Sequence, residues 1–170
     1  MIASPQVAAE KSKLDKLELW FARTQDMGLV REIMTIPAIY RAISDDSRPP
    51  IEQYEPPDHP AIWYLLAYDG DDLLGLWVLV PENSICWDVH TCLLPLALGV
   101  KGRSVAAARG AIQWVWKNTD CRRLVTKVPA FNRLALRFSR ESGMKEYGLN
   151  PKSYLKDGAL HDQILLGVSR

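Results

Sequence analysis

Between residues 85 and 128, a strand, a long helix and a second strand follow one another, and this order constrains the fold more than any other feature. The segment ICWDVHTCLL predicts a strand that ends at Pro95. A helix from about Arg103 to Asn118 places its apolar residues on one stripe, and RRLVTKV then predicts another strand. Two strands joined by a helix of this length lie parallel, with a right-handed crossover. The sequence therefore predicts a sheet that contains one parallel βαβ unit.

Antiparallel hairpins are predicted on both sides of this unit. The apolar runs AIWYLLAY and LLGLWVLV flank an Asp-Gly pair at 69–70, and a similar pair at 157–158 predicts a second tight hairpin. Residues 24–46 predict a helix that is interrupted at Pro37, which lacks a backbone donor. The first segment, LDKLELWFA, fits a strand or a short helix. We therefore expect an α/β fold: a mixed, mostly antiparallel central sheet with helices on both faces and one parallel crossover.

Length and composition restrict the class of protein. The 170 residues suffice for one domain with its own core, and we expect a loose segment over 1–13 and a single domain over 14–170. The formal net charge of +1 argues against a large basic surface for nucleic acid. Cys86, Cys92 and Cys121 form no Cys-x-x-Cys pair, and with three scattered histidines they predict neither a disulfide framework nor a metal site.

The apolar segments are short. The N-terminus has no apolar core of the length found in a signal peptide, and the longest apolar runs, of eight residues each, are too short to span a bilayer. We therefore expect a cytoplasmic protein without a membrane or nucleic-acid partner.

The turn GVKGRS, which precedes the long helix, contains residue types that bind an anion. Gly99 and Gly102 permit positive φ and the close approach of a ligand. The first amides of a helix are unpaired and electropositive, which favours phosphate oxygens. Lys101 and Arg103 add positive charge, and Ser104 adds a hydroxyl donor. The turn lacks the fingerprints of nucleotide-binding loops. Two alternatives stay open at this point: a pyrophosphate site, or a tight connection between strand and helix.

The segment after the second strand, VPAFNRLALRFSRESGMKEYG, resembles a signature of the GNAT superfamily of N-acetyltransferases. In that family an Asn begins the helix after the fifth strand, and the pattern continues Asn-x-x-Ala-x-x-Phe-Tyr-x-x-x-Gly-Phe. The residues at those spacings here are Asn132, Ala135, Phe138, Gly143 and Met144. The turn GVKGRS resembles the family's acyl-CoA loop, Gln/Arg-x-x-Gly-x-Gly/Ala, although a glycine replaces its first residue and a serine its last. The overall sequence pattern, with a histidine in the fourth strand, is similar to that of GNAT-like proteins encoded by bacteriophages.

The resemblance implies an N-acetyltransferase that moves an acetyl group from acetyl-CoA to an amine, by direct attack in a ternary complex and without a metal. Acetyl-CoA would lie where the fourth and fifth strands separate, with its pantetheine arm on main-chain groups and its pyrophosphate on the amides of the turn. The cofactor-binding residues would then be Leu93, Leu94, Gly99, Val100, Lys101, Gly102, Arg103, Ser104 and Asn132. The acceptor is an amine on a small molecule or on a protein.

Three residues are candidates for catalysis. Asp88 and His90 are two residues apart on the predicted strand and so share one face, and an imidazole suits a base at neutral pH. A hydrogen-bonded structural histidine is the alternative. Ser139 stands where the family often has the Tyr that protonates the departing CoA thiolate, and a serine hydroxyl is a poorer acid. This departure keeps a second function open: a catalytically inactive GNAT-fold binding or assembly protein.

Two further features allow more than one interpretation. The proline-rich loop 48–60, with Tyr54 and His59, fits either the acceptor side of the cleft or an ordinary connection. Trp114 falls almost opposite the apolar stripe of its helix, so it is exposed, or it is covered by another element or by a second subunit. The last alternative would make the protein a homodimer.

Overall fold

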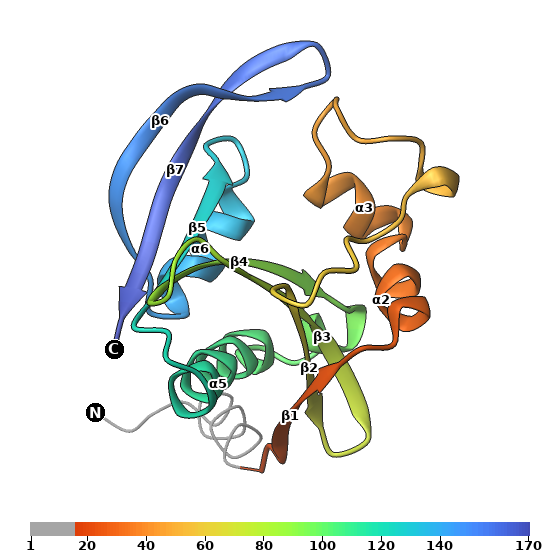
Figure 1. Cartoon of the computed structure of the whole chain (residues 1–170), viewed down its shortest axis with the longest axis vertical. Helices are drawn as coiled ribbons and strands as arrows, with labels where there is room; N and C mark the ends of the chain where they lie inside the picture. The colour runs from red at the N-terminus through yellow and green to blue at the C-terminus, as the bar shows by residue number, and fades with distance from the viewer. Residues whose placement is uncertain (1–15) are drawn as a thin grey trace, which may run out of the picture.

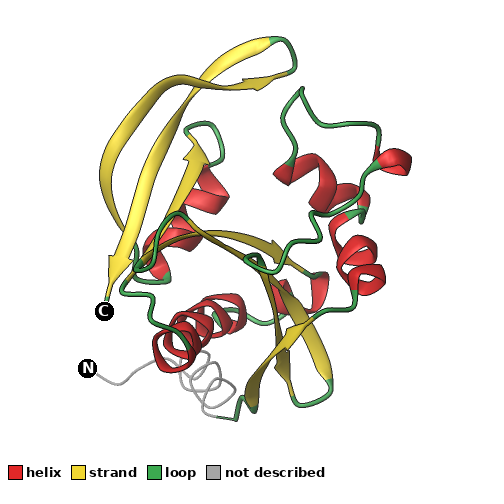
Figure 2. Ribbon diagram, in the orientation of Figure 1, coloured by secondary structure: helices red, strands yellow, loops and turns green. Residues whose placement is uncertain are grey.

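A seven-stranded sheet forms the centre of the protein (Figures 1 and 2). The computed structural model describes residues 16–170, and the predicted loose segment 1–13 lies outside them. The sheet order is β1-β2-β3-β4-β5-β7-β6. The strands are β1 (Leu19–Thr24), β2 (Trp63–Asp69), β3 (Asp72–Pro81), β4 (Cys86–Leu93), β5 (Arg123–Pro129), β6 (Lys145–Lys156) and β7 (Ala159–Ser169). Neighbouring strands are antiparallel except β4 and β5, which are parallel, so the predicted mixed sheet with one parallel crossover is confirmed.

Helices cover both faces of this sheet (Figure 1). They are α2 (Met27–Met34), α3 (Pro37–Ile43), α4 (Pro95–Leu98), α5 (Arg103–Asn118) and α6 (Arg133–Glu141), with a 3-10 turn, η1 (Ile51–Gln53). Alternation along the strands divides the core in two. Leu66 and Val78 pack with α2 and α3, whereas Leu65 and Leu79 pack with α5 on the opposite face.

Local sequence explains where these elements begin and end. The side chain of Asp26 accepts a hydrogen bond from Leu29 N at 3.0 Å and caps α2. Pro37 begins α3, where a missing N–H costs nothing, so the predicted interruption is confirmed. Gly70 and Gly158 have φ of 56° and 74°, as the two predicted hairpin turns require. The ambiguous first segment forms a strand from Leu19 onward, because β1 pairs with β2 from Leu19 to Thr24.

Three features differ from the sequence-based expectation or were not part of it. The short helix α4 was not predicted, and β6 begins at Lys145, well before the predicted hairpin. Trp114 packs edge-on against Trp63 of β2, with ring centroids 6.4 Å apart, so another element of the same chain covers it. The homodimer stays a prediction. Within residues 16–170, no helix combines the length and the apolar composition needed to cross a bilayer, and the cytoplasmic location also stays a prediction.

Candidate functional site

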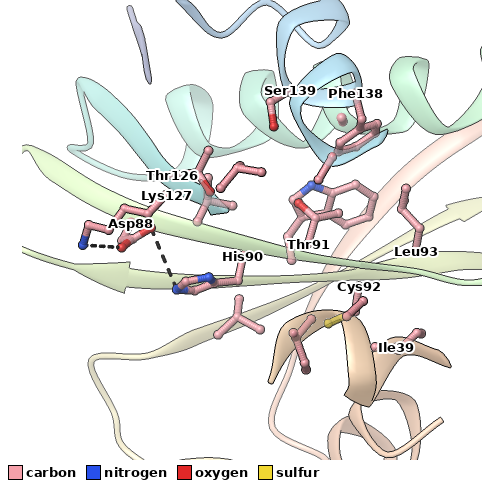
Figure 3. A pocket seen from close by; sticks show the side chains of 18 of the residues that line it. Ile39, Asp88, His90, Thr91, Cys92, Leu93, Thr126, Lys127, Phe138 and Ser139 are labelled. Atoms are coloured by element: carbon pink, nitrogen blue, oxygen red, sulfur yellow. Dashed lines mark hydrogen bonds and ion pairs between the residues drawn. The ribbon is translucent and has the colours of Figure 1, made fainter. Parts of the chain in front are cut away.

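A large cleft opens where the two parallel strands separate. β4 and β5 pair only from Cys86–Asp88 with Arg123–Val125, and beyond that point β4 stays with β3 while β5 stays with β7. The cleft has a volume of about 1340 Å³, and residues from both faces of the sheet line it. Figure 3 shows Phe138 and Ser139 of α6 on one side of β4 and Ile39 of α3 on the other. A ligand in the cleft can therefore pass from one face of the sheet to the other.

The backbone of β4 presents polar groups to this cleft. Hydrogen-bonded and non-bonded positions alternate along an antiparallel pair. Leu94 donates its amide hydrogen to Leu74 O at 2.9 Å, so the even-numbered residues of β4 direct their backbone groups toward β3. The odd-numbered residues Val89, Thr91 and Leu93 direct theirs toward the gap. The predicted main-chain contact of Leu93 is compatible with this geometry, whereas the amide of Leu94 is already bonded.

The N-terminus of α5 lies beyond the end of β4 and is preceded by the turn predicted to bind an anion. Gly102 is the N-cap residue with φ of 81°, and it has no side chain with which to cap the helix. The Arg103 amide bonds to Val100 O, but those of Ser104 and the next residue have no intrahelical acceptor. Gly99 has φ of −70° and ends α4 in an ordinary helical conformation, so it does not use the positive φ that a glycine permits. Lys101 lies exposed in this turn.

Arg103 has a structural role that its sequence position did not reveal. Its guanidinium, nearly buried, donates to Asp69 Oδ2 at 2.9 Å, to Asp72 Oδ2 at 2.7 Å and to Leu96 O at 3.1 Å. Both carboxylates belong to the β2–β3 turn, and their hydrogen bonds hold the pKa of Arg103 above its usual value. The side chain thus ties the start of α5 to the hairpin, and the expectation that its charge serves a phosphate stays a prediction.

Asp88 and His90 lie on one face of β4, together with Lys127 of β5 (Figure 3). Asp88 is buried; its Oδ2 accepts from Lys127 Nζ at 3.1 Å, and its Oδ1 has no hydrogen-bond partner and lies 3.9 Å from His90 Nε2. The half-exposed imidazole is therefore accessible from the cleft and beside a carboxylate. Hydrogen bonding and charge from Asp88 raise the pKa of Lys127, so that residue stays a cation. Sequence reasoning missed Lys127, although a lone lysine in the strand RRLVTKV was a signal.

Comparison with solved structures identifies this architecture. A spermidine N-acetyltransferase from Vibrio cholerae, solved with CoA and spermine, is 15% identical with a TM-score of 0.70, and the alignment covers 91% of this chain and 96% of that one. A GNAT-family acetyltransferase from Streptococcus pneumoniae is 16% identical with a TM-score of 0.65, over 90% and 100% of the two chains. A putative phosphinothricin N-acetyltransferase is 19% identical with a TM-score of 0.66, over 89% and 98%. The chain has the GNAT fold. Protein-family models and curated proteins give no match.

In this GNAT fold, α6 lines the cleft, as does Ser104 of the turn GVKGRS. Asn132 accepts from Ala135 N at 3.1 Å through its side-chain oxygen, so it caps α6 and leaves its amide nitrogen as a donor at the cleft. Ser139 is buried, and Figure 3 places its hydroxyl on the side of α6 that faces the cleft. Both candidates thus line one cavity with His90 and Asp88. No three His, Cys, Asp or Glu side chains within residues 16–170 cluster as metal ligands would.

The other mouth of the GNAT-fold cleft lies between α3 and the loop that follows it. Arg48 and Tyr54 line the cleft, which favours the acceptor-side interpretation of loop 48–60. His59 does not line it; its Nδ1 accepts from the Ala61 amide. Burial raises the pKa of Tyr54, partly opposed by the charge of Arg48. This side of the cleft is mainly apolar, because Ile39 and neighbouring residues of α3 form one of its walls.

Proposed function

We propose that the protein is an N-acetyltransferase that moves an acetyl group from acetyl-CoA to an amine. The observation that carries the proposal is the gap between β4 and β5, where the pairing stops at Asp88 and where Ser104, in the first turn of α5, lines the same cleft as the unpaired part of β4. An extended amide chain such as pantetheine can pair with the strand, and a pyrophosphate can accept hydrogen bonds from the helix amides. The residues of this chain therefore fit acetyl-CoA as a substrate.

The chemistry follows from the position of His90. The amine nitrogen attacks the acetyl carbonyl carbon, the N–C bond forms, and the C–S bond of the thioester breaks. His90 takes the proton that the amine loses, and Asp88 Oδ1 stabilises the imidazolium that results. The departing thiolate takes a proton from water or from the Ser139 hydroxyl. Holding both reactants in one cleft lowers the barrier by several kcal/mol, since translational freedom is lost before the reaction.

Calorimetric titration with acetyl-CoA tests the proposal, with desulfo-CoA and ATP as comparison ligands. We expect micromolar binding of acetyl-CoA and at least tenfold weaker binding by the variant Gly102→Ala, because a Cβ at φ of 81° strains the turn. Gly158→Ala is the matched control: it imposes similar strain at φ of 74°, but in the β6–β7 turn. Release of CoA thiol in the presence of amines then measures transfer. Absence of acetyl-CoA binding would contradict the proposal and favour a binding or assembly protein.

A further inference from the structure

Arg48 is the charged side chain of the cleft lining that has no counter-ion among the described residues. The acidic and basic side chains elsewhere in the lining form ion pairs: Glu55 with Arg31 at 3.1 Å, Asp88 with Lys127 at 3.1 Å, and Arg137 with Glu141 at 2.7 Å. No carboxylate of residues 16–170 forms an ion pair with Arg48, and its Nη1 is buried without a hydrogen-bond partner. One donor of this guanidinium is thus shielded from solvent without an anion among the described residues, which is unfavourable for a charged group.

Aromatic and thiol side chains share the cleft lining with this guanidinium. Arg48 lies 5.0 Å from the ring centroid of Tyr54, and its positive charge lowers the pKa of Tyr54, Tyr154 and Cys92 against the larger effect of burial. Arg48 therefore lines the cleft together with Tyr54 of the loop, Cys92 of β4 and Tyr154 of β6.

The carboxylates nearest to Arg48 in sequence are bound elsewhere. Asp45 accepts from the amide and hydroxyl of Ser47, and Asp46 accepts from the amides of Asp157 and Gly158. The amides hold the pKa of Asp46 below its usual value, so it remains an anion bound to that turn. Within residues 16–170, neither of these carboxylates pairs with Arg48, whose described contact is with the Tyr54 side chain.

From this arrangement we infer that the acceptor is a small amine that also carries a carboxylate or a similar oxyanion, which Arg48 binds. This inference rests on the proposed acetyltransfer. His90 and Cys92 lie on one face of β4, about 7 Å apart, and both line the same cleft as Arg48. An acceptor whose amine reaches His90 therefore extends its far end toward Arg48.

The remaining lining selects the body of the acceptor and disfavours polycations. Ile39, Ala42 and Ile43 of α3 give this side of the cleft an apolar wall. An apolar amino acid fits such a site, because its carboxylate would make charge-assisted bidentate hydrogen bonds to the arginine. A polyamine places a second cation beside Arg48, where charge repulsion opposes binding. This chain should therefore differ in acceptor from the spermidine N-acetyltransferase whose fold it shares.

Matched pairs of acceptors test the inference with the full-length protein and acetyl-CoA. The panel runs from glycine to 6-aminohexanoate and includes leucine and phenylalanine, aminophosphonates of equal length, the amines that lack the anion, and spermidine. We expect the anionic member of at least one pair to have a KM about 10- to 100-fold lower than its uncharged counterpart, as a charged hydrogen bond implies. The aminophosphonates distinguish carboxylate recognition from general oxyanion recognition. Equal or better use of the uncharged amines, or of spermidine, would overturn the inference.

The variant Arg48→Met, with Arg48→Lys beside it, assigns the preference to this residue. Arg48→Met should raise KM for the anionic acceptor by about the same 10- to 100-fold factor. KM for the uncharged amine and the affinity for acetyl-CoA should stay unchanged. Arg48→Lys should retain part of the preference for the anionic acceptor. Arg122→Met, an exposed arginine outside the cleft lining, is the control. An equal rise in KM for both acceptors, or weaker acetyl-CoA binding in the Arg48→Met protein, would overturn the inference. Calorimetry of the acceptors with the CoA-loaded protein gives the same comparison where turnover is slow. Intact acetyl-CoA binding without an anion preference contradicts this inference alone.

Discussion

Replacement of Arg103 with Met separates a structural arginine from a phosphate ligand. The side chain is 9% exposed, and the two carboxylates that it contacts, Asp69 and Asp72, are 15% and 50% exposed. Removing one partner of a buried ion pair costs about 3–5 kcal/mol. The half-exposed Asp72 regains water, and Asp69 still accepts from the Glu18 amide at 2.8 Å, which places the loss near the low end, at about 3 kcal/mol.

Thermal and urea unfolding measure this loss directly. For a chain of this size, about 3 kcal/mol lowers the Tm by roughly 6–12 °C. The control is Arg109→Met on the same helix: Arg109 is exposed and donates only to Glu141 O, so we expect a change below about 1 kcal/mol. Adding Asp69→Asn and Asp72→Asn to Arg103→Met should recover part of the stability, because no carboxylate is then left without its cation.

Binding of acetyl-CoA completes the test. If Arg103 ties α5 to the hairpin, Arg103→Met weakens acetyl-CoA binding only slightly and without a change in its salt dependence, since the guanidinium contacts protein groups. If Arg103 instead bound a phosphate of acetyl-CoA, Arg103→Met would weaken acetyl-CoA binding strongly and change its salt dependence. A Tm within about 3 °C of the parent, together with a tenfold, salt-dependent loss of acetyl-CoA affinity, would refute the structural role derived above.

Two further predictions concern titratable groups near the cleft. His90→Ala should lower kcat about 10²- to 10⁴-fold while acetyl-CoA still binds; an unchanged kcat would contradict the role of His90 as base. Burial raises the pKa of Cys92 from 9.0 to about 12, so its thiol should not react with a disulfide reagent at pH 8 until urea unfolds the chain. As the pH rises, the thiol ionises in the unfolded chain before it ionises in the folded one, so the free energy of unfolding should fall between pH 9 and 12. The fall should be smaller in Cys92→Ala. Rapid labelling of the thiol in the folded protein would refute the burial of Cys92.

Much of the fold is determined locally, and the sequence shows it. The Asp-Gly pairs give the turns their positive φ, Pro37 divides two helices, and Asn132 caps α6 through a bond that spans three residues. The parallel crossover follows from the order strand, helix, strand, because chain connectivity and handedness leave one solution. Such features depend on neighbours within one turn or one strand, so their residue types are sufficient evidence.

The candidate site depends on contacts between residues far apart in the chain, and only the tertiary structure decided those. The sequence placed Asp88 and His90 on one face but could not supply Lys127, which arrives on the neighbouring strand. It assigned Arg103 to a phosphate, whereas packing against the β2–β3 turn assigns it to two carboxylates. The sequence assigned no role to Arg48. Its lack of a counter-ion among the described residues is evident only in the structure, where the acidic and basic side chains elsewhere in the cleft lining are paired. Residue type sets what a side chain can bind, and the packing of distant segments decides what it meets.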